Sequence, residues 1–374
     1  MKIVIRAGGT GTRLWPWSTS ECPKQFLPMF DGRSCVQVAC DRFIGELAEP
    51  EDIYVSVGKA HKDLAADQLP KLSEEQLIVE PAKMDTAAAT GLETVVAAGE
   101  DPDVTIASLG SDHYIGKPQA FIEALRTAEE FLERTPERLL TIACEPTRVE
   151  TNYGHVKKGP QLASVRETPV YAVDQFTEKP DRPTAEKYTE SGQYLWNANF
   201  FVWKSGTLMR QFEEFEPHMY EGFMEIMAAR GTDRFAEVLE AKYPRLKKTA
   251  IDYAVLEPAS DRDRLAVLPV SMEWSDIGSW GSITDAFPPD EEGNLAEGPA
   301  VLKNSTNTTV WVKNPDRRLV AAVGVEGLAI VDVDGDGADE IVAGPNILKR
   351  DASGGWLRAE LVADLTPELD PRTC

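Results

Sequence analysis

Short apolar runs rich in β-branched residues recur through much of this 374-residue chain. Each run is typical of a buried or half-buried strand. The runs are KIVI, DIYVSVG, QLIVEP, VTIASL, LLTIAC, VYAVDQF and FFVW. Helical patterns lie between many of them, as in residues 85–100 and 119–134, where apolar side chains recur at helical spacing. Strands that alternate with helices predict an open α/β sheet, Rossmann-like, mixed and mainly parallel, with flanking helices.

The pattern changes near residues 286–300, where prolines, acids and glycines interrupt the helical periodicity. After this point the strand-like runs NTTVWVKN, RRLVAAVG and GLAIVDV are separated by turn residues, with no helical pattern between them. We therefore expect an α/β domain over residues 1–288. A small β-rich, β-helix-like domain should follow over residues 289–374.

The composition excludes several classes of protein. The net charge of -23 disfavours binding to nucleic acid, because the phosphate backbone would be repelled over most of the surface. No apolar run is long enough to span a membrane, and the N-terminus has no signal-peptide core, which predicts a cytoplasmic protein. The five cysteines form no CxxC pair, so we expect reduced thiols rather than a disulfide framework or a zinc site.

A glycine-rich loop follows the first predicted strand directly. Gly8, Gly9 and Gly11 would allow backbone N–H groups to approach a phosphate without obstruction by side chains. Arg13 would offer a planar fork and Lys24 a point charge, so the loop suits a triphosphate. The alternative interpretation is a tight turn with solvated cations.

The whole stretch AGGTGTRLWPWSTSECPKQFLP, residues 7–28, resembles the signature loop of the sugar-1-phosphate nucleotidyltransferases. Its LWPWS…PKQFL form resembles the mannose-1-phosphate guanylyltransferase branch of that family. Further matches occur in the same order as in the family: VEPAKMDTAAA, LGSDHYI, TNYGHV, FTEKP, YLWNANFF, AIDYAVLE and WSDIGSW. The resemblance implies a nucleotidyltransferase domain that transfers GMP from GTP to α-D-mannose 1-phosphate, giving GDP-mannose and pyrophosphate, with Mg²⁺ as cofactor.

The resemblance also implies a set of nucleotide-binding residues. They are Ala7, Gly8, Gly9, Gly11, Thr12, Arg13, Lys24, Glu80, Pro81, Ser111 and Asp112. Glu80 and Pro81 match the base-recognition segment, but Met84 and Asp85 depart from its usual continuation, which leaves the base preference open. Asp85 is also a candidate N-cap for the following helix. Arg6 departs from an aliphatic position, either as a further phosphate contact or as a solvent-facing strand end.

Asp112 and Asp276 each follow an apolar strand-like run, so both should lie at carboxyl ends of strands. Two carboxylates facing a triphosphate could hold Mg²⁺, which prefers oxygen ligands. Taken alone, either aspartate is more typical of a turn or a helix cap, whereas the resemblance implies that they are the metal ligands. His113 is expected to be structural, because a phosphate nucleophile is already ionised and requires no base.

The resemblance places Gly154, Glu178, Lys179 and Asn197 on the sugar phosphate. A carboxylate can accept hydrogen bonds from sugar hydroxyls, and a lysine can bind the phosphate. The alternative for Glu178 and Lys179 is an exposed salt-bridged pair. Asn199 occupies a family glycine position, which asparagine tolerates because it adopts left-handed backbone. Trp196 is expected in the core.

The predicted catalytic residues are Arg13, Lys24, Asp112, Lys179 and Asp276. Arg13 and Lys24 would stabilise the leaving pyrophosphate, and Lys179 would aim the nucleophile. Another nucleotide or hexose 1-phosphate, or a catalytically silent nucleotide-sugar-binding subunit, remain as alternatives. The sequence does not fix the oligomeric state, although β-rich C-terminal segments of relatives often pair subunits and make a homodimer an option.

An acidic stretch, DVDGDGADEIV, lies outside the family pattern. Asp332, Asp334 and Asp336 alternate as in a calcium loop, but the twelfth position of that pattern is Ala343 rather than glutamate. Because aspartate and glycine are also the residues that tight turns select, an acidic β-turn is the favoured interpretation.

Overall fold

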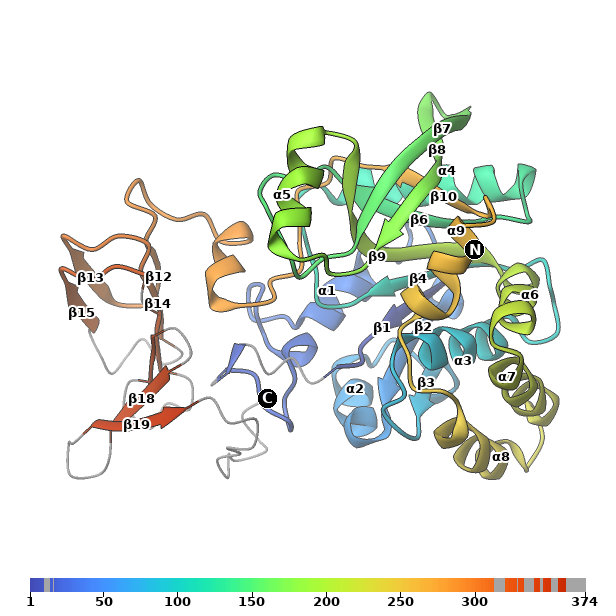
Figure 1. Cartoon of the computed structure of the whole chain (residues 1–374). Coiled ribbons are helices and arrows are strands. Elements are labelled where there is room, and N and C mark those ends of the chain that lie inside the picture. The colour runs from blue at the N-terminus through green and yellow to red at the C-terminus, as the bar shows by residue number, and fades with distance from the viewer. Residues whose placement is uncertain are drawn as a thin grey trace. The chain divides into compact units, whose positions relative to one another are not determined.

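The computed structural model describes residues 1–9, 14, 15, 17–312 and 320–327, together with the backbone of strands at 329–332, 340–343, 346–350 and 356–360. Its contacts divide the chain into two compact units (Figure 1). The first unit comprises Met1–Gly8, Val36–Ser111 and Ile115–Trp274. The second comprises Gly9–Cys35, Asp112–Tyr114 and the C-terminal part from Ser275. Among the predicted site residues, Gly11, Thr12 and Arg13 lie outside the described residues.

The first unit contains a nine-stranded sheet. Its strands are β1 (Lys2–Arg6), β2 (Ile53–Gly58), β3 (Leu77–Glu80), β4 (Thr105–Gly110), β6 (Leu139–Cys144), β7 (His155–Val165), β8 (Thr168–Thr177), β9 (Tyr194–Lys204) and β10 (Leu265–Pro269). The order is β3-β2-β1-β4-β9-β6-β10-β8-β7. Parallel pairing joins β3, β2, β1 and β4 and also joins β6 to β10, whereas β9 and β8 run against the others. The predicted mixed, mainly parallel sheet is confirmed.

Helices cover both faces of this sheet (Figure 1). They are α1 (Cys35–Asp41), α2 (Lys62–Gln68), α3 (Thr86–Ala98), α4 (Pro118–Arg134), α5 (Arg182–Ser191), α6 (Ser205–Phe215), α7 (Pro217–Ala229), α8 (Phe235–Lys242) and α9 (Glu257–Ser260). Neighbouring residues of a strand point to opposite faces. In β9, Phe201 joins the core formed with α3, α6 and α7, whereas Phe200 packs 4.6 Å from Phe121 of α4.

Helix α3 begins where its N-cap was predicted. Asp85 has a φ of 69°, and its side chain accepts a hydrogen bond from Thr86 N at 2.7 Å. The start of α3 is also tied to a distant segment, because Ile251 N donates to Thr86 Oγ1 at 2.9 Å and Ala87 N donates to Thr249 O at 3.1 Å. The segment between Glu80 and Thr86 is therefore fixed by β3 at one end and by the anchored start of α3 at the other.

The second unit has its own aromatic core. Trp17 lies 6.2 Å from Trp280 and 4.8 Å from Trp311 between ring centroids, and Leu14 and Ile277 pack in the same cluster. Its strands are β12 (Leu295–Glu297), β13 (Ala300–Lys303), β14 (Thr309–Val312), β15 (Val320–Val323), β16 (Ala329–Asp332), β17 (Glu340–Ala343), β18 (Asn346–Arg350) and β19 (Trp356–Glu360).

These C-terminal strands form two small sheets, which confirms the predicted β-rich segment. Strands β12, β14 and β16 pair in parallel, as do β13 and β15, while β16 to β19 pair antiparallel. The predicted domain boundary at residue 288 stays a prediction. Asp334 and Asp336 of the acidic stretch lie outside the described residues.

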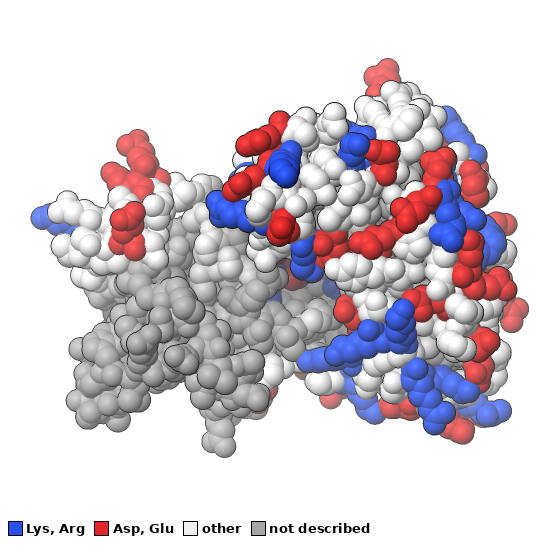
Figure 2. Space-filling model, in the orientation of Figure 1, with Lys and Arg blue, Asp and Glu red and all other residues white. Residues whose placement is uncertain are grey.

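Two short strands, β5 (Tyr114–Ile115) and β11 (Trp274–Ser275), complete the elements. No helix in the described parts of the chain is both long and apolar enough to cross a membrane. The visible face in Figure 2 carries acidic side chains interleaved with basic ones.

The cysteines differ in part from the expectation of reduced thiols. Cys35, Cys40 and Cys144 are buried reduced thiols, and burial raises the pKa of Cys40 and of Cys144 to about 12. These thiols are packing groups, because a buried thiol with a high pKa forms little reactive thiolate. Cys22 is disulfide-bonded, so the expectation was wrong at this position.

Candidate active site

The predicted site residues fall into two groups. The first unit holds Ala7, Gly8, Glu80, Pro81, Ser111, Gly154, Glu178, Lys179 and Asn197, and the second unit holds Gly9, Lys24, Asp112 and Asp276. The chain passes from one unit to the other between Gly8 and Gly9 and between Ser111 and Asp112.

In the first unit, the nucleotide-side residues meet at one edge of the sheet. Glu80 ends β3, Ala7 follows β1 and Ser111 follows β4, and these parallel strands share their carboxyl edge. Ala7 N donates to Ser56 O at 2.7 Å, and Ser111 N donates to Arg6 O at 3.1 Å. Ligands of open α/β sheets bind at this edge, so the position agrees with the predicted nucleotide-binding role, which stays a prediction.

Glu80 lies beside the glycine loop. A Cβ added to Gly8 would lie 3.6 Å from Glu80 Oε1, and Tyr243 and Ser56 donate to the same carboxylate at 2.6 and 3.3 Å. Burial raises the pKa of Glu80, and the hydrogen bond from Tyr243 opposes that rise. No motif in the sequence pointed to Tyr243 or Ser56 as supports of this carboxylate.

In the second unit, Gly9 and Lys24 have backbone and packing suited to the predicted anion loop. Gly9 has a φ of 95°, a conformation that a residue with a side chain adopts only under strain. Lys24 is 3% exposed in a short 3₁₀ turn, Lys24–Phe26, and the neighbouring Gln25 Nε2 donates to Gly9 O at 3.2 Å. A lysine is seldom buried unless it is paired.

Lys24 brings the two predicted metal ligands together. Its Nζ lies 3.1 Å from Asp112 Oδ2 and also donates to the backbone oxygen of Asp276. Burial would raise the pKa of Asp112, but the charges of Lys24 and His113 lower it to about 2. Asp112 is therefore a carboxylate at any physiological pH, with its oxygens directed at a cation.

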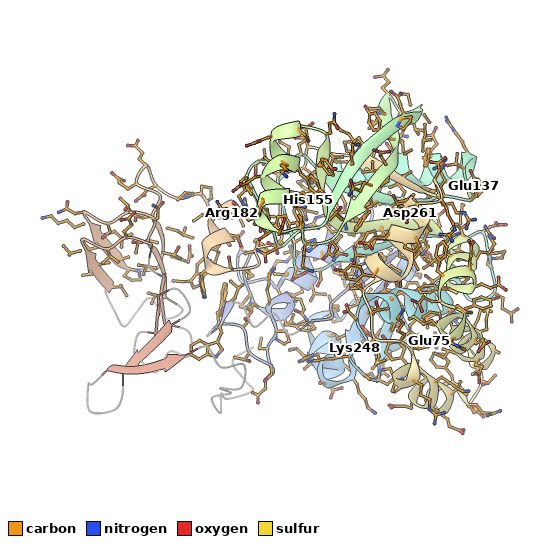
Figure 3. All side chains as sticks on the ribbon, in the orientation of Figure 1. Glu75, Glu137, His155, Arg182, Lys248 and Asp261 are labelled. Carbon is orange, nitrogen blue, oxygen red and sulfur yellow. The ribbon has the colours of Figure 1, made fainter. Side chains whose placement is uncertain are left out.

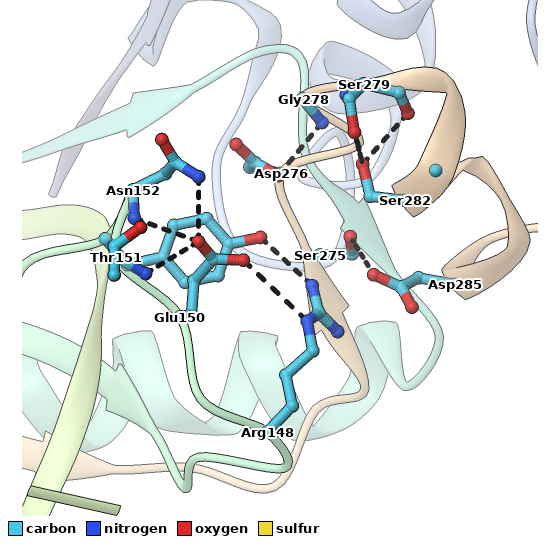
Figure 4. A network of polar contacts seen from close by, with 12 residues as sticks. Arg148, Glu150, Thr151, Asn152, Ser275, Asp276, Gly278, Ser279, Ser282 and Asp285 are labelled. Atoms are coloured by element: carbon cyan, nitrogen blue, oxygen red, sulfur yellow. Dashed lines mark hydrogen bonds and ion pairs between the residues drawn. The ribbon is translucent and has the colours of Figure 1, made fainter. Parts of the chain in front are cut away.

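Asp276 is held by the turn that follows it (Figure 4). Gly278 N donates to Asp276 Oδ1 at 2.9 Å, and a Cβ at Gly278 would collide with the Asp276 carboxylate. Ser275 Oγ, which donates to Asp285 at 2.8 Å, accepts from Ile277 N at 3.2 Å. Glycine at position 278 therefore leaves room for the carboxylate in this turn.

The donor set around Lys24 fits a hard divalent cation. Asp112 and Asp276 supply carboxylate and carbonyl oxygens, and an ammonium group already lies between them. No group of three or more acidic, histidine or cysteine ligands occurs among the residues that the structure describes. Mg²⁺ usually binds through one or two carboxylates plus substrate phosphates and water, so a pair of aspartates is sufficient.

The side chain of His113 is 8% exposed, and its Nε2 lies 3.7 Å from Asp112 Oδ1. This position agrees with the expected structural role. His155, labelled in Figure 3, is buried, and its Nδ1 lies 3.0 Å from Tyr153 O. Burial lowers the pKa of His155, so this histidine is neutral near neutral pH.

The sugar-side residues of the first unit pack around Gly154. A Cβ at Gly154 would lie 2.7 Å from Glu178 Oε2 and 3.2 Å from Asn197 Cβ, so only glycine allows these side chains to approach. Asn197 N also donates to Gly154 O at 2.8 Å. The turn before Gly154 is fixed by Glu150, which accepts from Thr151 N at 2.8 Å (Figure 4).

Asn197 belongs to a buried polar chain that includes a residue without a predicted role. Its Oδ1 accepts from Thr141 Oγ1 at 2.7 Å, and its Nδ2 donates to Asp252 Oδ1 at 3.5 Å. Asp252 begins a π-helical turn, Asp252–Leu256, and burial followed by the charge of Glu178 raises its pKa to about 7. The motif AIDYAVLE, which contains Asp252, was the only signal for it in the sequence.

Glu178 and Lys179 form the salt bridge that was the alternative interpretation. The Nζ–Oε1 distance is 2.5 Å, and the Lys179 side chain is 61% exposed, whereas that of Glu178 is 11% exposed. Lys179 has a φ of 48°, an unusual backbone for a residue with a long side chain. Their sugar-phosphate roles stay predictions.

Three further expectations concern Asn199 and Arg6, which depart from the resembled pattern, and the predicted core residue Trp196. Asn199 has a φ of 57°, which confirms the left-handed backbone expected there. Arg6 is 8% exposed, so the solvent-facing alternative is wrong. Trp196 is 2% exposed, as expected for a core residue.

The first unit therefore has a mixed, mainly parallel sheet with predicted ligand-binding residues at its carboxyl edge, and the second unit brings Asp112 and Asp276 to one lysine, Lys24. Residues 2–293 match the family described as nucleotidyl transferase, and the chain belongs to that family.

Within the family, this chain is similar to named mannose-1-phosphate guanylyltransferases. The protein of that name from Klebsiella pneumoniae is 36% identical over 332 residues, covering 88% of this chain and 68% of the relative. One from Escherichia coli K12 is 32% identical with the same coverage. A solved structure from Thermus thermophilus, described as mannose-1-phosphate geranyltransferase, has a TM-score of 0.79 at 31% identity and covers 91% of this chain and 94% of that one.

Proposed function

We propose that this chain is a mannose-1-phosphate guanylyltransferase, which converts GTP and α-D-mannose 1-phosphate into GDP-mannose and pyrophosphate. The observation that carries the proposal is its similarity, over 88% of its length, to enzymes of that name. The pair of aspartates at Lys24 and the glycine loop supply the groups that nucleotidyl transfer requires. We further propose that the enzyme is cytoplasmic and forms a homodimer through its C-terminal strands.

The reaction exchanges one phosphoanhydride partner for another. An oxygen of the sugar phosphate attacks the α-phosphorus of GTP in line, and the bond to the β-phosphate oxygen breaks as pyrophosphate leaves. The attacking oxygen is already ionised, so no residue has to remove a proton. Catalysis then consists of positioning and electrostatic stabilisation of the transferring group.

Residues of the second unit act on the phosphates. Asp112 and Asp276 would hold Mg²⁺, which when bound neutralises charge on the triphosphate. Lys24, which is buried and in contact with Asp112, would bind the leaving pyrophosphate. Arg13, outside the described residues, is assigned the same task.

Residues of the first unit orient the base and the sugar. The half-buried Glu80 carboxylate offers acceptors to the base, and the bare backbone of Gly8 allows the nucleotide to approach. Ala7 and Ser111, whose backbone N–H groups donate to Ser56 O and Arg6 O, would line the same edge of the sheet. Glu178 and Asn197 offer oxygen and amide groups to sugar hydroxyls, and the exposed Lys179 ammonium would bind the sugar phosphate. These polar groups suit a hexose phosphate.

A substrate panel tests the proposed function. Pyrophosphate release is measured with Mg²⁺ and each combination of GTP or ATP with mannose 1-phosphate or glucose 1-phosphate. We expect the highest kcat/KM for GTP with mannose 1-phosphate. A higher value for another combination would reassign the substrates, and no release with any combination would favour the silent binding subunit.

A further inference from the structure

Arg6 is a buried cation at the end of β1. Its Nη1 donates to Ser108 Oγ at 2.5 Å, and its Nη2 donates to Asn199 O at 2.6 Å and to Asn199 Oδ1 at 2.9 Å. Arg6 and Asn199, which both depart from the resembled pattern, are therefore direct partners. The guanidinium fork joins β1 to β4 on one side and to β9 on the other.

The buried carboxyl group of Glu93 and the half-buried one of Glu80 both interact with the charge of Arg6. Ser108 Oγ donates to Glu93 Oε2 of α3 at 2.6 Å, and Glu93 is fully buried. Burial raises the pKa of Glu93 to about 7, and the charge of Arg6 opposes the rise. Ser56, which donates to Glu80 Oε1 at 3.3 Å, is the residue of β2 that pairs with Arg6 of β1. Burial also raises the pKa of Glu80, and the hydrogen bonds from Tyr243 and Ser56 and the charge of Arg6 act in the opposite direction.

Arg6 is also linked to the sugar-side residues. Asn199, which its guanidinium clasps, donates its backbone N–H to Asn197 Oδ1 at 3.3 Å. Asn197 in turn contacts Asp252. Burial raises the pKa of Asp252, and the positive charges of Lys179 and Arg6 act against this rise. Arg6 therefore lies opposite Ser56, which donates to Glu80, and its side chain contacts Asn199, which donates to Asn197.

A purely structural explanation accounts poorly for this arrangement. Burying a guanidinium among carboxyls costs desolvation that its hydrogen bonds recover only in part, and well-packed apolar residues are often as stable. Buried charge at the edge where ligands bind is more typical of a functional site than of a core.

We propose that Arg6 is a positioning residue for both substrates: its charge keeps Glu80 a hydrogen-bond acceptor on the nucleotide side, and its fork holds Asn199 and, through it, Asn197 on the sugar side. The proposal rests on the proposed function, which supplies the two substrates. It assigns Arg6 no contact with either of them.

Three variants separate the charge from the fork. Arg6→Leu removes both the charge and the fork. Arg6→Lys keeps the charge, but its single ammonium group cannot reach Ser108 and both Asn199 oxygens together. Asn199→Gly removes the Oδ1 acceptor and tolerates the positive φ at this position. Arg134→Leu on α4 is the control, because it removes one positive charge from an exposed pair with Glu130.

The test measures kcat/KM for each substrate across the range from about pH 6 to about pH 9, where an ionising carboxylate defines the acid limb. For Arg6→Leu we expect the acid limb for GTP to move to higher pH and the KM for mannose 1-phosphate to rise about tenfold. Arg6→Lys and Asn199→Gly should raise the KM for mannose 1-phosphate several-fold while leaving the acid limb in place. The control should match the wild type.

A second readout follows carboxyl protonation without relying on turnover, and a double variant assigns the titrating group. Infrared spectra of protein with isotope-labelled glutamate report the protonated carboxyl fraction near neutral pH. This fraction should be larger in Arg6→Leu than in wild type. Glu80→Gln and Arg6→Leu/Glu80→Gln should share one acid limb, because the group that Arg6 acts on is absent from both.

The outcomes separate this proposal from the proposed function. An active wild type with pH profiles and KM values unchanged in Arg6→Leu overturns the role of Arg6 alone. A wild type without activity or binding of either substrate by calorimetry overturns both. If circular dichroism shows that Arg6→Leu is unfolded, the KM for mannose 1-phosphate in Arg6→Lys and Asn199→Gly decides, and wild-type values in both overturn the proposal.

Discussion

At the residue scale, the charge state of Asp112 follows from its neighbours. The pKa falls from 3.8 to about 2 because Lys24 and His113 outweigh burial. A folded-state pKa below the unfolded value contributes stability that is present above about pH 4 and is lost as the pH falls toward about pH 2. At neutral pH this carboxylate is therefore always available to a cation.

Asp112→Asn keeps the shape of the side chain and removes its charge. We expect kcat to fall by about a hundredfold or more, because the metal and Lys24 lose an anionic partner. Pyrophosphate release measures the loss, and circular dichroism checks the fold. Asp233→Asn, at an exposed position, should be neutral. Near-normal turnover of Asp112→Asn would remove this residue from the metal role.

The pKa of Asp252 is shifted in the opposite direction to that of Asp112. Burial and Glu178 raise its pKa to about 7, so ionisation in the folded state costs stability, which is lost as the pH rises from about pH 4 through about pH 7. Asp252→Asn should remove this loss and gain on the order of 1 kcal/mol at about pH 8 relative to wild type. Urea unfolding at about pH 5 and about pH 8 measures the difference. Equal slopes with pH in both proteins would contradict the assignment.

At the scale of elements, the turn after β11 shows how backbone positions a ligand. A Cβ at Gly278 would collide with the Asp276 carboxylate, whereas one at Gly281 would meet only Ser279 Oγ at 3.8 Å. Gly278→Ala should therefore displace Asp276 and lower kcat about tenfold or more, whereas Gly281→Ala should leave kcat unchanged. Initial rates at saturating substrates measure both variants. Equal rates would show that the turn does not position Asp276.

The sequence predicted the elements whose pattern is local. The apolar runs of β1 to β4 and the helical spacing of α3 and α4 appear as expected. The direction of β9, the π-helical turn at Asp252 and the Arg6–Asn199 clasp were not predicted, because each depends on partners distant in sequence. Periodicity reports which face of an element is buried, and says nothing of what lies against it.

At the scale of the whole molecule, the net charge of -23 is unfavourable for two anionic substrates. Mg²⁺ and the basic residues assigned to the phosphates offset this repulsion locally. Removal of divalent ions with EDTA should therefore reduce pyrophosphate release to background, and excess Mg²⁺ should restore it. Undiminished release in EDTA would rule out the predicted cofactor.

Part of the site could be predicted from the sequence. Strand ends and glycine loops predicted the edge that holds Glu80, Ala7 and Ser111, since carboxyl ends of parallel strands share an edge. The contact of Lys24 with both Asp112 and Asp276 required the folded chain, because these residues lie far apart in sequence. The choice of base and sugar came from resemblance and similarity rather than from any single contact.

The most direct measurement is the identity of the products. Phosphorus NMR of the wild-type protein with Mg²⁺, GTP and mannose 1-phosphate should show equal amounts of pyrophosphate and of a new diphosphate diester, GDP-mannose, formed as both substrates disappear. Unchanged substrate signals, or pyrophosphate without the diester, would contradict the account.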